Sequence, residues 1–139
     1  MAERVFRKRS EKNGRGDIEV SSASLFNMEG APADPGAVGI LEEKGFNGYG
    51  HKSRLLTEDM IAETDMILVM EQQHRGMLIE NYPDAKGRVF LLKPFSSGCS
   101  RLNSGDMDDI KDPYNLSNYH YRLCFAEIYL AVEGVLKCI

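Results

Sequence analysis

Residues 66–70 read MILVM and residues 89–92 read VFLL. Both runs are continuous and apolar, which is typical of strands that are buried on both faces of a sheet. Between them, residues 71–82 return to the apolar spacing of a helix. A strand, a helix and a second strand in this order form a unit whose two strands lie parallel, so the sequence predicts an α/β fold.

The alternation of strands and helices continues on both sides of this unit. Prolines that can open a helix, glycines that can stop one and hydroxyls that can cap one mark the further boundaries. The expected architecture is a parallel sheet covered by helices on both faces, in a single domain over residues 1–139. In chain order, the further elements are a helix over residues 1–13 with a stop at Gly14, a strand over residues 17–23 (DIEVSSA), a helix from Pro35 to a stop at Gly45, a short helix after Thr57, a long loop over residues 93–113 and a helix that starts at Ser117.

The composition is that of a globular domain with a sizeable core, since 42% of the 139 residues are hydrophobic and 27% are charged. The apolar runs are far shorter than the ~20 residues that cross a bilayer, and the first residues do not form a secretory signal. We therefore expect a cytoplasmic protein that does not insert into membranes. A net charge of −4 gives no general attraction to nucleic acid. The cations gathered before Gly14 are expected to form the solvated basic face of the first helix.

The chain has three cysteines, Cys99, Cys124 and Cys138, which are odd in number and widely spaced. Such spacing is typical neither of a disulfide framework nor of a metal cluster. We therefore expect reduced thiols, no metal site and no cofactor.

The triplet Asp112-Pro113-Tyr114 stands at the end of the long predicted loop. In a parallel sheet, ligands bind outside the carboxyl ends of the strands, and this loop should lie on that rim. Proline biases the residue before it toward an extended conformation, so the carboxylic acid of Asp112 would point in a defined direction. A fixed carboxylic acid can donate a proton to a leaving group, although Asp-Pro-Tyr is also common in ordinary turns.

Read in order, several pieces of the chain resemble the low-molecular-weight protein tyrosine phosphatases, and they span almost the whole chain with their spacing preserved. The resemblance implies a three-layer phosphatase fold and, for the family, hydrolysis of phosphotyrosine through a cysteinyl-phosphate intermediate. Phosphotyrosine proteins or small aryl phosphates would be the partners of a chain that has the family's catalytic loop. A related family with the same fold reduces arsenate and uses additional cysteines after its third strand. The corresponding residues 71–83 contain no cysteine, so the phosphatase family is the better match. The matching pieces are Met1-Ala2-Glu3 with Phe6-Arg7-Lys8, VSSA at residues 20–23, GAPAD at residues 30–34, GHKSRLLT at residues 50–57, DMILVM at residues 65–70, VFLL at residues 89–92, and Asp112-Pro113-Tyr114 before an amphipathic helix.

The departure from the family lies at the front of the chain. Family members begin with a strand and a loop of cysteine, five residues, arginine and serine. The cysteine thiolate of that loop is the nucleophile, and the arginine and loop N–H groups bind the phosphoryl oxygens. Here the sequence begins at the Met-Ala-Glu that follows the loop, and no later cysteine has an arginine six residues on. The resemblance therefore implies a family member that lacks its first strand and catalytic loop, and we expect it to be inactive as it stands.

The other site residues of the family can be carried over one at a time. Asp112 matches the general acid, and Ser22 and His51 match a serine and a histidine that support the catalytic loop through hydrogen bonds. Tyr114 matches a tyrosine of the substrate rim. Phe26 falls near the family's rim aromatic, although the residues before it depart from the family pattern. Taken alone, these residues also fit a strand-end hydroxyl, a turn histidine and half-exposed aromatic side chains.

Two functional hypotheses follow from the sequence. In the first, the chain is a shortened form of a protein tyrosine phosphatase, through a misassigned start or a truncation. In the second, it is a native remnant that binds or regulates without hydrolysis, and the reading frame before Met1 discriminates between the two. The family's first strand would lie between residues 17–23 and 66–70, so we expect the sheet to close up or to borrow a strand in a swapped homo-oligomer.

Overall fold

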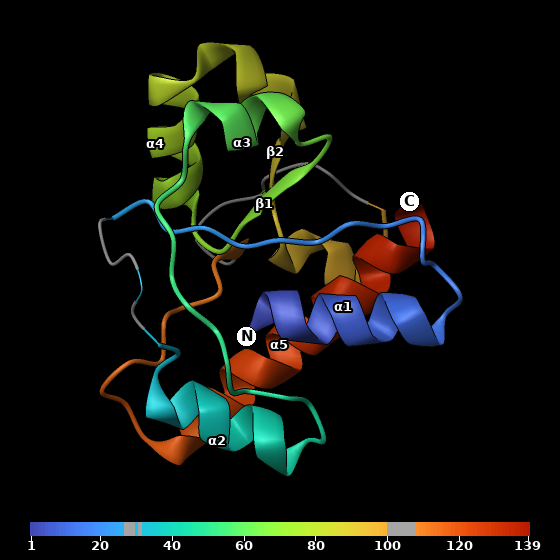
Figure 1. The fold of residues 1–139 in the computed structure, drawn as a ribbon, viewed down its shortest axis with the longest axis vertical. Coiled ribbons are helices and arrows are strands. Elements are labelled where there is room, and N and C mark those ends of the chain that lie inside the picture. The colour runs from blue at the N-terminus through green and yellow to red at the C-terminus, as the bar shows by residue number, and fades with distance from the viewer. Residues whose placement is uncertain (27–29, 31, 100–107) are drawn as a thin grey trace.

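The structure is a computed structural model that describes residues 1–26, 30, 32–99 and 108–139. Helices predominate, and a pair of strands lies among them (Figure 1). The elements, in chain order, are α1 (Ala2–Lys12), α2 (Pro35–Glu43), α3 (Glu58–Glu63), β1 (Ile67–Val69), α4 (Gln72–Asn81), the 3₁₀ helix η1 (Pro83–Arg88), β2 (Val89–Leu91), the 3₁₀ helix η2 (Lys93–Ser97) and α5 (Asn118–Cys138).

Strands β1 and β2 form a parallel pair, and their side chains alternate between two faces. Leu68 and Phe90 lie opposite one another and pack with the core that α1, α2 and α5 build. The residues of the other face pack with α3, α4 and η1. The predicted parallel sheet with helices on both faces is therefore confirmed. The residues of that other face are Ile67, Val69, Val89 and Leu91.

Helix α5 is the centre of the larger core, since it packs against η2, α1 and α2. Val132 and Val135 on its inner face are fully buried, as is Phe95 of η2. At Gly134 the two backbones come so close that an added Cβ would lie 1.8 Å from the carbonyl oxygen of Phe95. Only glycine can occupy this position without moving one of the two elements.

Local sequence signals set the starts of the helices. Asp34 precedes α2, and its side chain accepts a hydrogen bond from the N–H of Gly36. Thr57 caps α3 by accepting from the N–H of Met60, as the sequence predicts. Helix α1 has no side-chain cap, because Met1, which precedes it, is not a capping residue type.

Residues 17–23 do not form a strand, so that prediction is wrong. Their apolar side chains Ile18 and Val20 are half-buried against the larger core. The backbone carbonyls of this segment are bound by arginine side chains, because Arg7 donates to Val20 and Arg54 donates to Ser22. These arginine side chains therefore bind backbone carbonyls that the N–H groups of a neighbouring strand would bind in a sheet.

The sheet has not closed up in the way expected from the sequence. Within the described residues, β1 pairs with β2 alone. The segment after residue 23 instead makes an isolated parallel bridge between Ser24 and Leu55. The swapped homo-oligomer stays a prediction.

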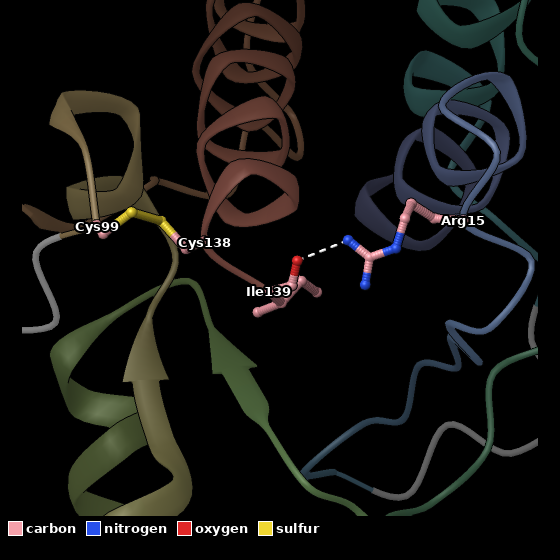
Figure 2. Close-up of a disulfide and its surroundings, with 4 residues drawn as sticks. All are labelled: Arg15, Cys99, Cys138 and Ile139. Carbon is pink, nitrogen blue, oxygen red and sulfur yellow. Dashed lines mark hydrogen bonds between the residues drawn. A yellow bond between two sulfur atoms is a disulfide. The ribbon is translucent and has the colours of Figure 1, made fainter.

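Two of the three cysteines form a disulfide, so the expectation of three reduced thiols is wrong. Cys99 follows η2 and Cys138 ends α5, and their Cα atoms lie 5.6 Å apart (Figure 2). Sequence spacing could not indicate the pair because the two residues are 39 positions apart and meet only when α5 packs on η2. Nearby, the side chain of Arg15 donates to the carbonyl of Ile139 at 2.6 Å (Figure 2).

The long loop predicted over residues 93–113 is interrupted by η2. Pro94 at the start of η2 has the fixed φ that a first helical turn needs, and the five residues are too few for the helical periodicity to be read. Residues 100–107 lie outside the described part of the chain. No helix of the described residues is long and apolar enough to span a membrane.

We predict that Gly134→Ala destabilises the protein by about 1–3 kcal/mol or more, because the new methyl group overlaps the Phe95 carbonyl. Gly76→Ala is the matched control, since a Cβ there meets nothing within 4 Å. In the interior of α4 that change should stabilise the protein by about 0.5–1 kcal/mol. Chemical denaturation of both variants measures the difference, and equal stabilities would contradict the close packing of α5 on η2.

We also predict that reduction of the Cys99–Cys138 disulfide lowers the free energy of unfolding by about 2–4 kcal/mol, because the bond restricts the unfolded chain. Thermal unfolding with and without a reductant measures the loss. The variant Cys99→Ser should unfold at one temperature in both conditions, which controls for effects of the reductant elsewhere. A wild-type chain insensitive to reductant would show that the bond is absent in solution.

Candidate functional site

Polar groups gather around the start of α1. The α-amino group of Met1 lies at the N-terminal end of this helix, where the first N–H groups have no side-chain cap. Burial is the main cause that lowers the pKa of this amine, and the charge of nearby Glu3 opposes the shift. Arg4 adds a second cation, whose Nε is buried and makes no hydrogen bond within the described residues. An anion at this end of α1 would meet the guanidinium group of Arg4 and the free N–H donors of the first turn.

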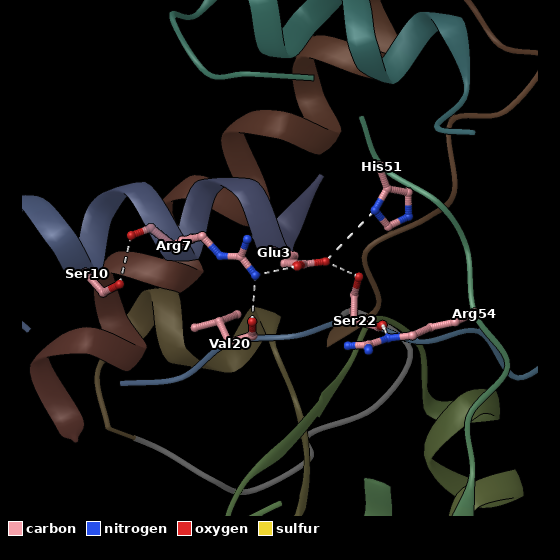
Figure 3. A network of polar contacts seen from close by, with 7 residues as sticks. All are labelled: Glu3, Arg7, Ser10, Val20, Ser22, His51 and Arg54. Carbon is pink, nitrogen blue, oxygen red and sulfur yellow. Dashed lines mark hydrogen bonds and ion pairs between the residues drawn. The ribbon is translucent and has the colours of Figure 1, made fainter. Parts of the chain in front are cut away.

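Glu3 joins the two residues that the resemblance assigns to loop support. The hydroxyl of Ser22 donates to Oε2 of Glu3, and Nδ1 of His51 lies 4.0 Å from the same oxygen (Figure 3). The other carboxylate oxygen accepts from Arg7 at 2.8 Å. The structure thus brings Ser22 and His51 together through a carboxylate between them.

Two arginines hold the backbone of residues 20–22 against this cluster. Arg7 extends from α1 and donates to the carbonyl of Val20 at 2.9 Å, and Arg54 donates to the carbonyl of Ser22 at 3.0 Å (Figure 3). Because the two arginines come from opposite sides of the segment in sequence, they fix the hydroxyl of Ser22 beside α1.

His51 is mostly neutral at neutral pH. Burial of its ring is the main cause that lowers its pKa, and the charge of the Met1 amine lowers it further, while Glu3 opposes both. A neutral imidazole has one donor and one acceptor nitrogen, so His51 can orient a neighbouring group through hydrogen bonds without adding charge.

The loop that carries Asp112 is fastened to the end of β1. The N–H of Ile110 donates to the carbonyl of Met70 at 2.8 Å, and the N–H of Gln72 donates to the carboxylate of Asp109 at 2.8 Å. Met70 directly follows β1, so the Asp112 loop lies at the carboxyl end of the parallel pair, where the sequence places the active rim. Asp112 itself is exposed, and its carboxylate accepts from the N–H of Tyr114 at 3.0 Å.

A buried tyrosine connects the start of α5 with the start of α2. The hydroxyl of Tyr121 donates to the carboxylate of Asp34, and this bond is the main cause that raises the pKa of Tyr121 to about 12, with burial and the negative charge of Asp34 adding to it. Asp112 contributes a smaller electrostatic effect. The phenol therefore stays protonated at neutral pH and ties two helices together behind the Asp112 loop.

The two aromatic residues expected on the substrate rim are both exposed. Phe26 has 57% of its surface accessible and Tyr114 has 61%. Tyr114 is two residues from Asp112 in the same turn, whereas Phe26 follows the Ser24–Leu55 bridge. Glu3, Ser22 and His51 are called the Glu3 cluster below. No hydrogen bond or ion pair in the described part of the chain links Asp112 to this cluster.

None of the cysteines in the structure offers a thiolate. Cys99 and Cys138 are joined to each other, and Cys124 is buried in α5. Burial is the main cause that raises the pKa of the Cys124 thiol to about 11, and the charge of Glu127 adds to the effect. Among the described residues, no group of three or more histidine, cysteine or acidic side chains is placed to hold a metal ion.

Sequence reasoning missed the residues that connect the site. Glu3 has a signal in the sequence, because an acid in the first turn of an uncapped helix is favourably placed for polar contacts. The pair of Asp34 and Tyr121 has none, since 87 positions separate the two residues. Long-range hydrogen bonds of this kind depend on how the helices pack.

The chain is similar in sequence to bacterial phosphatases. The protein-arginine-phosphatase of Geobacillus stearothermophilus is 33% identical over 120 residues, which cover 86% of this chain and 76% of that protein. The low molecular weight protein-tyrosine-phosphatase Wzb of Escherichia coli K12 is 31% identical over 117 residues, covering 84% of this chain and 71% of Wzb.

Solved structures show the same fold. The low molecular weight protein tyrosine phosphatase of T. tengcongensis superposes with a TM-score of 0.87 at 27% identity, covering 99% of this chain and 88% of that one. The sequence profile of the "Low molecular weight phosphotyrosine protein phosphatase" family matches residues 1–139. The resemblance read from the sequence is confirmed: the chain belongs to the low molecular weight phosphotyrosine protein phosphatase family.

Proposed function

We propose that this chain carries the general acid and the loop-supporting residues of a phosphatase that acts on phosphotyrosine or small aryl phosphates. The observation that supports the proposal most is the attachment of the Asp112 loop to the carboxyl end of β1, through Ile110 and Met70. Membership of the phosphatase family supports the reaction class. The nucleophile loop is not among residues 1–139, so hydrolysis requires that a loop of this kind be supplied.

With such a loop in place, the chemistry divides between the loop and this chain. The loop thiolate attacks phosphorus, and the bond from phosphorus to the tyrosyl oxygen breaks. Asp112 transfers its proton to that oxygen, because a phenolate with a pKa near ~10 is a poor leaving group at neutral pH. The resulting Asp112 carboxylate then accepts a proton from the water that attacks the phosphocysteine, which releases phosphate and restores the thiolate.

The remaining site residues would position the loop. Ser22 and His51 share the carboxylate of Glu3, and Arg7 and Arg54 hold this cluster at the start of α1. We propose that these side chains exchange some of these bonds for bonds to the loop when it is present. Phe26 and Tyr114 are exposed, as the walls of a site for an aryl group would be.

A second candidate function is binding or regulation without hydrolysis. The observation in its favour is that the cysteines of this chain are disulfide-bonded or buried and protonated. This candidate and the first differ in what happens when the family's strand and loop are placed before Met1. Hydrolysis by this lengthened chain supports the phosphatase. If the lengthened chain folds and binds aryl phosphate without turnover, the result supports the binding protein.

Cytoplasmic location is part of the proposal, and it affects the disulfide. Cys99 is exposed, so a reducing compartment would convert the Cys99–Cys138 bond to thiols. The chain would then fold in the cell without the stabilisation that the bond gives in an oxidising solution.

We predict that the chain of residues 1–139 hydrolyses p-nitrophenyl phosphate only at the background rate, because it has no available thiolate. The same chain preceded by the family's strand and Cys-X5-Arg loop should be active, and its Cys-to-Ser version should be inactive. Release of p-nitrophenol measures the three proteins. Turnover by the chain alone, at its intact mass, would overturn the assignment of the nucleophile to the loop.

In the chain that is preceded by the family's strand and Cys-X5-Arg loop, Asp112→Asn should reduce the rate for phenyl phosphate by about 10²–10⁴-fold. The rate for p-nitrophenyl phosphate should fall much less, because its leaving group needs little protonation. Asp109→Asn is the matched control for loop structure, since Asp109 binds the N–H of Gln72 and is not assigned to proton transfer. Equal losses on both substrates would give Asp112 a structural role instead.

A further inference from the structure

A hollow of about 310 Å³ lies beside the C-terminal half of α1, away from the start of the helix where the candidate site gathers. Three aromatic side chains and four cations line it, and no carboxylate is among the lining residues. The cations come from α1 and from the end of α2, and the rings come from α5 and from Phe46. The lining residues are Lys8, Arg9, Lys12, Lys44, Phe46, Phe125 and Tyr129.

The aromatic side chains form a connected wall. The rings of Phe46 and Phe125 lie 5.6 Å apart between centroids, and Phe125 and Tyr129 are stacked at 6.0 Å. Phe46 and Phe125 are buried, whereas Tyr129 is half-buried. The ring surface that the wall offers next to solvent therefore belongs chiefly to Tyr129, and aromatic surface of this kind is common in ligand pockets.

Two cations are already held over this wall. Lys8 lies 5.0 Å from the centroid of Phe46 and donates to the carbonyl of Gly45. Arg9 lies 5.5 Å from the centroid of Tyr129 and is paired with Glu133. The expectation of a solvated basic face on the first helix does not hold for these two residues, because their side chains fold back onto the rings.

The other two cations have no such partner. Lys12 and Lys44 are exposed, and the ammonium group of neither makes a hydrogen bond or ion pair in the described part of the chain. Lys12 follows Lys8 by four residues, so the two like charges repel along the helix. Each of Lys12 and Lys44 is individually favoured at the end of its own helix. Helix ends do not explain why both charges border one hollow that has an aromatic wall.

We propose that this hollow binds a small phosphate monoester that carries an aromatic ring. The ring would lie against the exposed part of the aromatic wall, and the phosphate would lie between Lys12 and Lys44, whose two charges match a dianion. The volume of the hollow falls at the lower end of the range for ligand pockets, about 300–1,000 Å³, which suits a ligand with one ring system.

This site is separate from the candidate phosphatase site. No lining residue belongs to the Glu3 cluster or to the Asp112 loop. Lys12 is nine residues beyond Glu3 on α1, which corresponds to about 13 Å along the helix. The proposal therefore does not depend on the proposed function, and occupancy of one site can be distinguished from occupancy of the other.

The experiment titrates the chain of residues 1–139 with phenyl phosphate and follows the backbone amide signals by NMR. We expect saturable shifts at residues 8–12 and 44–46. Inorganic phosphate should bind several-fold more weakly because it has no ring, and phenol should bind several-fold more weakly because it has no charge. Adenosine monophosphate in place of phenyl phosphate shows whether a larger ring system is accepted.

The double variant Lys12→Gln/Lys44→Gln should weaken the binding of phenyl phosphate about tenfold or more. The control is Lys86→Gln/Lys137→Gln, which removes the same charge from two exposed lysines outside the hollow and should leave the affinity unchanged. The proposal is overturned by shifts confined to residues 22, 51 and 112–114, by equal loss in both double variants, or by inorganic phosphate binding as tightly as phenyl phosphate.

Discussion

The contact between Gly134 and the Phe95 carbonyl is the constraint on which most of the structure depends. Strand β2 leads directly into η2, and η2 packs on α5 at this point. Helix α5 in turn carries α1 and α2. The positions of the sheet, α1 and α2 relative to one another therefore depend on this one close backbone approach. A side chain at residue 134 would push α5 away from the sheet and disturb all three.

Much of the fold could be predicted from the sequence because its signals are local. The apolar runs at 66–70 and 89–92 become β1 and β2, and Thr57 caps α3 as expected. Residues 17–23 could not be predicted, because their alternating pattern describes which side chains are buried and not which backbone groups are paired. The Cys99–Cys138 bond could not be predicted either, since it depends on the packing of α5 against η2.

The candidate site, like the fold, could be predicted from the sequence only in part. The sequence points to Asp112, Ser22 and His51, and the structure brings two of these together through Glu3. Asp112 is placed by bonds from its loop to the end of β1, which follow from the topology of a parallel sheet. Glu3 was overlooked because a carboxylate in the first turn of a helix is ordinary. Its importance arises from two side chains that are distant in sequence and converge on it.

The burial of Cys124 has a practical consequence. Under oxidising conditions it is the one free thiol among the three cysteines of the chain, and it lies inside the core with its proton retained. Because the thiol is buried and protonated, an alkylating reagent reacts with it slowly unless α5 moves away from the elements that cover it. The rate at which one alkyl group is added per molecule therefore reports how often the native protein opens, without any label having to be introduced.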